Sequence, residues 1–169
     1  YSRNIPGACD NYSSSGRSIE RSLCSVVAVL TDGNIAIPVE QSIWTSEEFD
    51  PTNYKTKIYL AQQLISQVRL HAIFYVAILY GFFASEVLFY WLNANNIRFE
   101  MRFHSNRVIE KNGTRFKIRD CPFFKLVRGR IRRTIMAFWH KLPLHFTALK
   151  RQLKNGDFTT VFQVSNFKA

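Results

Sequence analysis

The sequence predicts a mixed α/β (α+β) fold, in which a part containing helices is followed by a β-rich, basic part. Three observations support this prediction: a β-hairpin pattern near the beginning, a strand-turn-helix pattern in the middle, and alternating apolar and polar residues near the end. The chain has 169 residues, of which 47% are hydrophobic and 21% are charged. This composition is ordinary for a globular protein with a substantial core.

The first predicted elements form a hairpin. Residues 1–21 are rich in Ser, Asn and Gly and predict a loop. Residues 23–30 and 35–44 are rich in β-branched residues and flank an Asp32-Gly33 pair, which favours two strands joined by a tight turn. Pro38 cannot donate a main-chain hydrogen bond, so the second strand is expected at an edge or with a bulge.

The middle of the chain predicts helix, strand, helix and strand in turn. Residues 54–70 place apolar side chains at helical spacing, which is typical of an amphipathic helix. Residues 74–79 form an apolar run that ends at a Tyr-Gly pair. A helix is expected over residues 84–93, with Ser85 near its start, and the alternating residues 98–103 predict a half-buried strand.

The last part of the chain predicts β-structure. Residues 130–140, 142–150 and 157–165 are expected to be strands, and an Asn-Gly pair within residues 154–157 predicts the turn between the last two. We therefore expect two domains, residues 1–104 and residues 105–169. The second domain is the basic β-rich lobe.

Tyr80 occupies the position of greatest functional interest. A short apolar run that is closed by a turn and followed by a helix predicts a central strand of an α/β sheet. In such sheets, ligands bind beyond the carboxyl ends of the strands, where polar or acidic side chains are common. The residue at this position is a tyrosine. A phenol is a poor ligand for hard divalent cations, which prefer carboxylates.

The positive charge is concentrated in one half of the chain. The net charge is +11, yet residues 98–154 contain 16 Lys and Arg against three acids. This asymmetry indicates a polyanionic partner, and DNA bound through its backbone is the partner we expect. A solvated basic face without a partner is the alternative. The candidate DNA-binding residues are Arg128, Arg130, Arg132, Arg133, Lys150, Arg151 and Lys154. On a strand, Arg130 and Arg132 would share one face and Arg133 would point to the other.

A membrane-associated protein anchored through residues 72–92 is a second hypothesis. The unbroken apolar run of residues 72–84 has 13 residues, whereas a membrane span needs about 20. This length favours a buried segment over a span. The three cysteines are widely spaced and odd in number, which favours a reducing, cytoplasmic location.

Several short motifs, taken in order, resemble the DDE transposases of bacterial insertion sequences, in particular the IS4-like group with an RNase H-like core. The likeness extends over nearly the whole chain and lies in the order and spacing of the pieces. They are Gly16-Arg17-Ser18, Leu30-Thr31-Asp32-Gly33-Asn34, Ile37-Pro38-Val39, Ile43-Trp44, Tyr54-Lys55-Thr56-Lys57-Ile58, Leu79-Tyr80-Gly81-Phe82-Phe83-Ala84-Ser85 and Val164-Ser165-Asn166.

The resemblance implies a partial RNase H-like mixed sheet with flanking helices, plus the basic β-rich lobe as an insertion. Members of the family use three carboxylates and two Mg²⁺ ions to cut and join DNA. Tyr80 stands where the family has its second Asp, and the first Asp and the Glu would fall outside this sequence. The resemblance therefore implies a fragment without catalytic activity, metal site, resident cofactor or small-molecule substrate.

The expected residual property of such a fragment is nonspecific binding to DNA, and association with an intact transposase is a further expected interaction. A third hypothesis stays open beside the transposase and membrane hypotheses: a basic α/β binding module unrelated to transposition.

Overall fold

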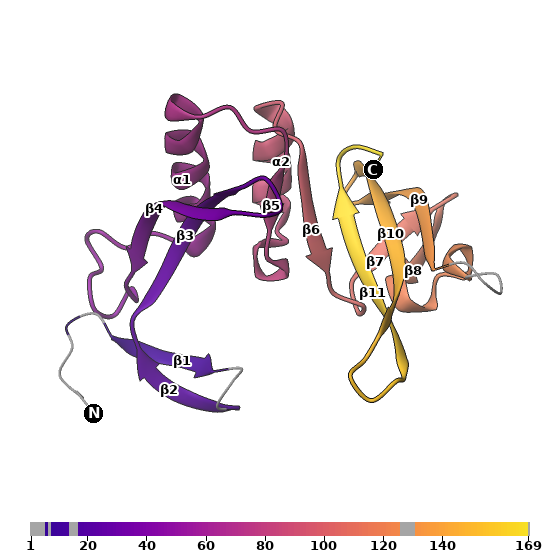
Figure 1. Cartoon of the computed structure of the whole chain (residues 1–169), viewed down its shortest axis with the longest axis horizontal. Coiled ribbons are helices and arrows are strands. Elements are labelled where there is room, and N and C mark those ends of the chain that lie inside the picture. The colour runs from indigo at the N-terminus through magenta and orange to yellow at the C-terminus, as the bar shows by residue number, and fades with distance from the viewer. Residues whose placement is uncertain (1–5, 7, 14–16, 126–130, 169) are drawn as a thin grey trace. The chain divides into compact units, whose positions relative to one another are not determined.

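The computed structural model, shown in Figure 1, describes residues 6, 8–13, 17–125 and 131–168. The chain divides into two compact units, Tyr1–Phe74 and Tyr75–Ala169. The described residues form a seven-stranded mixed sheet, two two-stranded sheets and two α-helices. The predicted mixed α+β class is therefore confirmed. The domain boundary expected after residue 104 falls within the second unit, between two strands of the seven-stranded sheet.

The first unit begins with a hairpin where the sequence predicted only a loop. Strands β1 (Cys9–Ser13) and β2 (Ser18–Ser22) pair antiparallel. The side-chain amide of Asn11 donates to the main-chain oxygens of Cys9 at 3.0 Å and Ser22 at 3.1 Å. The loop prediction was wrong for these residues because main-chain pairing holds the hairpin together. The sequence shows no alternating apolar face that would have revealed it.

The predicted hairpin of the first unit is confirmed. Strand β3 (Cys24–Thr31) pairs antiparallel with β4 (Ala36–Trp44), and the register shifts beside Pro38, leaving Val39 as a bulge. At the turn, a carboxylate oxygen of Asp32 accepts from the main-chain N–H groups of Asn34 at 2.8 Å and Ile35 at 2.9 Å. The hydrogen bonds from Ile35 and Asn34 lower the pKa of Asp32 below its usual value.

Helix α1 (Lys57–His71) covers one face of the β3–β4 hairpin. The hydroxyl of Thr56 caps the helix by accepting from the N–H of Tyr59 at 3.1 Å. The helix buries Leu60, Ala61 and Leu64. The predicted amphipathic helix is therefore confirmed, with its first turn beginning three residues later than expected.

The second unit is built on the seven-stranded sheet, whose strand order is β5-β6-β11-β10-β9-β7-β8. The only parallel pair in this sheet is β5 with β6, and the other pairs are antiparallel. The strands are β5 (Ala77–Leu79), β6 (Phe99–Phe103), β7 (Val108–Lys111), β8 (Thr114–Lys117), β9 (Arg132–Trp139), β10 (Leu142–Gln152) and β11 (Phe158–Ser165).

Two features of this sheet differ from the sequence expectation. Strand β5 lies at the edge of the sheet and is only three residues long, so the prediction of a central strand was wrong. The apolar run was misleading because much of it is exposed: Tyr75 is 86% exposed and Ile78 is 77% exposed. The β7–β8 hairpin was missed, although Asn112 and Gly113 form its turn with positive φ angles of 53° and 74°.

The predicted second helix is confirmed as α2 (Glu86–Ala94), which begins two residues and ends one residue later than expected. The hydroxyl of Ser85 accepts from the N–H of Leu88 at 3.2 Å, and Asn95 is the C-terminal cap. Asn96 follows in the left-handed conformation with φ at 53°. The described part of the second unit also contains three short 3₁₀ turns: η1 (Gly81–Phe83), η2 (Ile118–Asp120) and η3 (Pro122–Phe124).

An aromatic cluster joins α2 to the sheet. The ring of Phe89 stacks on Phe99 with centroids 4.8 Å apart and meets Trp139 edge-on at 4.9 Å. Phe103 contacts Trp139 at 5.5 Å and Phe146 at 5.3 Å. These side chains are almost fully buried. The cluster therefore bridges three strands, β6, β9 and β10, that are distant in the sequence, and it forms the centre of the core.

Residues 72–92, the segment of the membrane hypothesis, include β5, η1 and most of α2. Across the ranges that the structure describes, no helix combines the length and the apolar character needed to cross a membrane.

Replacing the central ring of the cluster is expected to destabilise the second unit. Phe89→Ala should lower the free energy of unfolding by about 3–5 kcal/mol, because it removes a fully buried ring and leaves a cavity. Val87→Ala, on the same helix but 67% exposed, is the matched control and should change it by less than about 0.5 kcal/mol. Urea denaturation followed by far-UV circular dichroism measures both. Equal effects of the two substitutions would contradict the role of the cluster.

Candidate functional site

Helix α2 packs against one face of the seven-stranded sheet. We call the opposite face, which makes no aromatic contact with α2, the open face. The strand register defines its members, because directly paired residues project to the same side of a sheet. Arg132 pairs with Leu149, which pairs with Val161, and Gln163 on the same strand pairs with Arg102. The hydroxyls of Thr134 and Thr147 lie 2.9 Å apart at the middle of this face.

The open face carries an excess of positive charge. By the same register, it includes five cationic side chains, all of them exposed: Arg102, Arg115, Lys117, Arg132 and Arg151. Its acidic members are Glu100, which pairs with Ser165, and Glu110, which pairs with Arg115. A surface with this balance attracts anions, and exposed Arg side chains can each donate several hydrogen bonds to a phosphate.

The structure describes five of the seven basic residues that the sequence singled out, and it separates them. Of these five, only Arg132 and Arg151 lie on the open face. Arg133 is on the opposite face, where its guanidinium donates to the main-chain oxygen of Lys125 at 2.8 Å. Lys150 is also on that face, with its ammonium 5.5 Å from the ring centroid of Phe158.

Lys154 lies in the turn between β10 and β11. Arg128 and Arg130, the remaining two candidates, fall outside the described residues.

Sequence reasoning missed three members of the open face. Arg102 was expected in a half-buried strand, but its strand neighbour β11 comes about sixty residues later, so no local pattern linked it to the basic lobe. Arg115 and Lys117 lie on β8, which the sequence analysis did not recognise as a strand. The Asn112-Gly113 turn was the available signal for them, because such a pair favours a two-residue hairpin.

Tyr80 immediately follows β5 and precedes η1, so the predicted position at the carboxyl end of a strand is confirmed. Its side chain is 74% exposed. Within the described part of the chain, no three His, Cys, Asp or Glu side chains come together in a way that could hold a metal ion.

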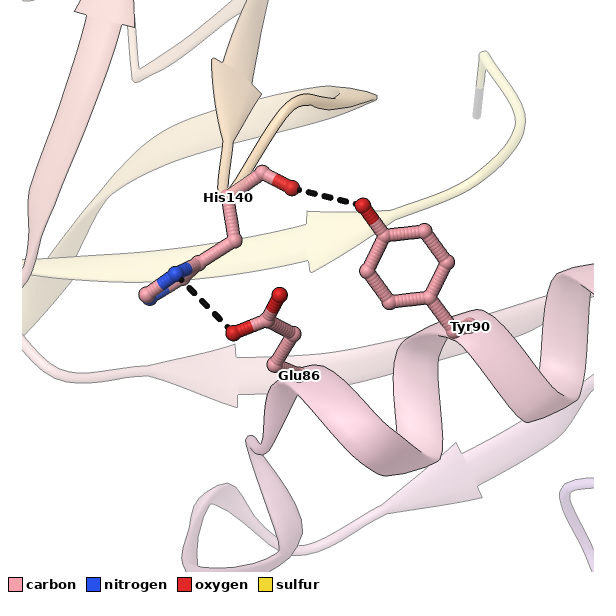
Figure 2. A network of polar contacts seen from close by, with 3 residues as sticks. All are labelled: Glu86, Tyr90 and His140. Atoms are coloured by element: carbon pink, nitrogen blue, oxygen red, sulfur yellow. Dashed lines mark hydrogen bonds and ion pairs between the residues drawn. The ribbon is translucent and has the colours of Figure 1, made fainter.

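A polar cluster connects α2 to the turn between β9 and β10 (Figure 2). The phenol of Tyr90 donates to the main-chain oxygen of His140 at 2.9 Å, and the imidazole Nδ1 of His140 lies 3.1 Å from a carboxylate oxygen of Glu86. His140 and Lys141 both have positive φ angles, 46° and 65°, as a tight two-residue turn requires. These contacts hold the strained turn against the helix, which is a structural role.

Gly81, the residue after Tyr80, lies very close to the main chain of strand β6. A Cβ atom at Gly81 would lie 2.8 Å from the main-chain oxygen of Arg102 on β6. Alanine is therefore compatible only if η1 or β6 shifts.

Gly81→Ala is expected to destabilise the second unit by about 1–3 kcal/mol, because a rigid main-chain atom blocks the added methyl group. Tyr80→Phe, in the same turn and at an exposed side chain, is the control and should change stability by less than about 0.5 kcal/mol. Thermal unfolding of the two variants tests this expectation, and an unchanged midpoint for Gly81→Ala would contradict it.

Comparison of the chain with models of known protein families and with curated proteins finds no match in either case.

Proposed function

We propose that this chain is a noncatalytic, DNA-binding fragment related to the DDE transposases, and that its second unit binds the DNA backbone through the open face. The observation that carries the binding proposal is the convergence of five exposed cations, from strands β6, β8, β9 and β10, on one side of a single sheet. Two acids share that face, so a net positive surface remains.

The arrangement favours contacts with phosphates over reading of bases. The cations come from strands that are spread across the sheet, and each presents its charge on a broad surface. Contacts of this kind position a nucleic acid and supply affinity without sequence information. Their strength depends on the release of counterions, and this makes the binding sensitive to salt.

The transposase part of the proposal is supported by the order of elements around Tyr80. Strand β5, parallel to its neighbour, ends at Leu79, and Tyr80 leads into η1 and the capped helix α2, which is the order that the motif residues 79–85 imply. A phenol at this point offers no carboxylate for a divalent metal. We infer that this chain retains affinity for DNA without the ability to cleave it.

The binding proposal makes a prediction about salt. If most of the five cations neutralise phosphates, raising the salt from 50 to 200 mM should weaken binding to duplex DNA on the order of 10²- to 10³-fold. Fluorescence anisotropy with a labelled duplex measures this change. Flat binding across that range would contradict a phosphate interface.

Substitutions on the open face should weaken the same binding. The double variant Arg102→Ala/Arg132→Ala should reduce the slope of log affinity against log salt by about 2, because two phosphate contacts are lost. Arg119→Ala, an exposed arginine in η2, is the control for loss of positive charge and should leave the slope nearly unchanged. Similar slopes for the two proteins would exclude the open face as the binding surface.

The absence of cleavage is tested separately. Incubation with supercoiled plasmid and Mg²⁺ or Mn²⁺ should give no nicking above a blank without protein. Tyr80→Asp should also be inactive, because a single restored carboxylate does not make the multi-carboxylate metal site that this chemistry uses. Turnover by either protein would overturn the noncatalytic part of the proposal without affecting the binding part.

A further inference from the structure

The hairpin formed by the ends of β10 and β11 extends beyond the rest of the seven-stranded sheet (Figure 1). The ladder between β9 and β10 ends at Leu149, with one further main-chain hydrogen bond from the N–H of Lys150 to the oxygen of Ile131 at 2.8 Å. On the other side, β6 pairs with β11 only from Phe162 onward. Between these limits β10 and β11 pair with each other, and every residue from 150 to 160 is exposed. We call residues 150–160 the arm.

Hydrogen bonds fix the tip of the arm. The N–H of Leu153 donates to the oxygen of Asp157 at 2.6 Å, and the N–H of Gly156 donates to the oxygen of Leu153 at 3.0 Å. Gly156 has a φ of 89°, a conformation that favours glycine. The side-chain amide of Asn155 donates to the carboxylate of Asp157 at 2.7 Å. The arm is therefore preordered, which lowers the entropy cost of binding.

The charge of the arm is positive. Lys150, Arg151 and Lys154 are its cations, and Asp157 is its single acid. The carboxylate of Asp157 accepts a hydrogen bond from the side-chain amide of Asn155 within the turn, which offsets part of its negative charge. Both polar side-chain atoms of Asn155 are engaged within the turn, because its amide donates to Asp157 and its oxygen accepts from the N–H of Asp157. The donor available at the tip is the exposed ammonium of Lys154, a group that can reach phosphates or base edges.

We propose that the arm enters the major groove of B-form duplex DNA while the open face, as in the proposed function on which this inference rests, contacts the backbone. The arm extends about four to five residues past the sheet, or roughly 13–16 Å at the rise of a strand. The major groove is about 8.5 Å deep and about 12 Å wide, and it admits a two-stranded ribbon. The minor groove, about 6 Å wide, is too narrow for two strands and their side chains.

The same geometry distinguishes between kinds of nucleic acid. The major groove of A-form RNA is deep and narrow, so side chains on a ribbon cannot read it. A single strand has no groove to enclose the arm. The inference therefore predicts that B-form duplex DNA is preferred over duplex RNA and over single-stranded DNA of the same sequence.

Dimethyl sulfate footprinting of the full chain on a duplex of mixed sequence tests the location of the arm. The reagent methylates guanine N7, which lies in the major groove, and adenine N3, which lies in the minor groove. At low salt, bound protein should protect guanine N7 and leave adenine N3 reactive. Competition by duplex RNA and by single-stranded DNA should be weaker than competition by duplex DNA.

The double variant Lys150→Ala/Lys154→Ala should lose most of the guanine N7 protection. It should also reduce the slope of log affinity against log salt by about 2. The control is Arg119→Ala/Lys168→Ala, which removes two exposed charges from outside the arm and should retain protection. Circular dichroism melting of both variants shows whether the fold is kept, because the substituted side chains are all exposed.

The outcomes separate this inference from the proposed function. Absence of any complex with duplex DNA at low salt would overturn both. A salt-sensitive complex without guanine N7 protection, or equal protection by the arm variant and its control, would overturn the arm inference alone. Protection of adenine N3 or a preference for single strands would also overturn it.

Discussion

The packing of α2 against one face of the seven-stranded sheet is the constraint on which the second unit depends. Four phenylalanines, Phe89, Phe99, Phe103 and Phe146, are almost fully buried in this contact. Each contributes about 1.5–3 kcal/mol through removal of apolar surface from water. Exposed charges interact much more weakly, usually by less than about 1 kcal/mol per pair. Burial of the aromatic side chains therefore determines the register of the sheet. Because successive residues of a strand project to opposite faces, the neighbouring arginines lie on the other face.

The basic surface is thus a consequence of the same alternation that builds the core. Met101 and Phe103 on β6 are buried, and Arg102 between them is exposed on the open face. The same relation holds on β9, where Ala137 and Trp139 are buried and Arg132 and Met136 are not. A slip of one residue in register would bury the charges and expose the rings, at a cost that the fold could not sustain.

Much of the local structure could be predicted from short-range patterns. The Asp32-Gly33 turn, the Ser85 cap and the long β10–β11 hairpin depend on neighbouring residues, so the sequence reveals them. The β1–β2 and β7–β8 hairpins escaped prediction because their strands are short and mostly polar. The apolar run before Tyr80 was predicted to be a central strand but forms an edge strand. A pattern of apolar residues indicates a strand, but it does not show how many strands pair with it.

By itself the sequence determined the class of fold, most strand and helix positions, and the concentration of positive charge in the second half of the chain. The tertiary structure alone decided which of those charges act together. Arg102 and Gln163 meet across a sheet although sixty residues separate them, and Arg133 turns away from Arg132 to bind a main-chain oxygen. The physical reason is that strands far apart in the sequence pair to form this surface. The closure of the long loops between them does not depend on any short sequence pattern.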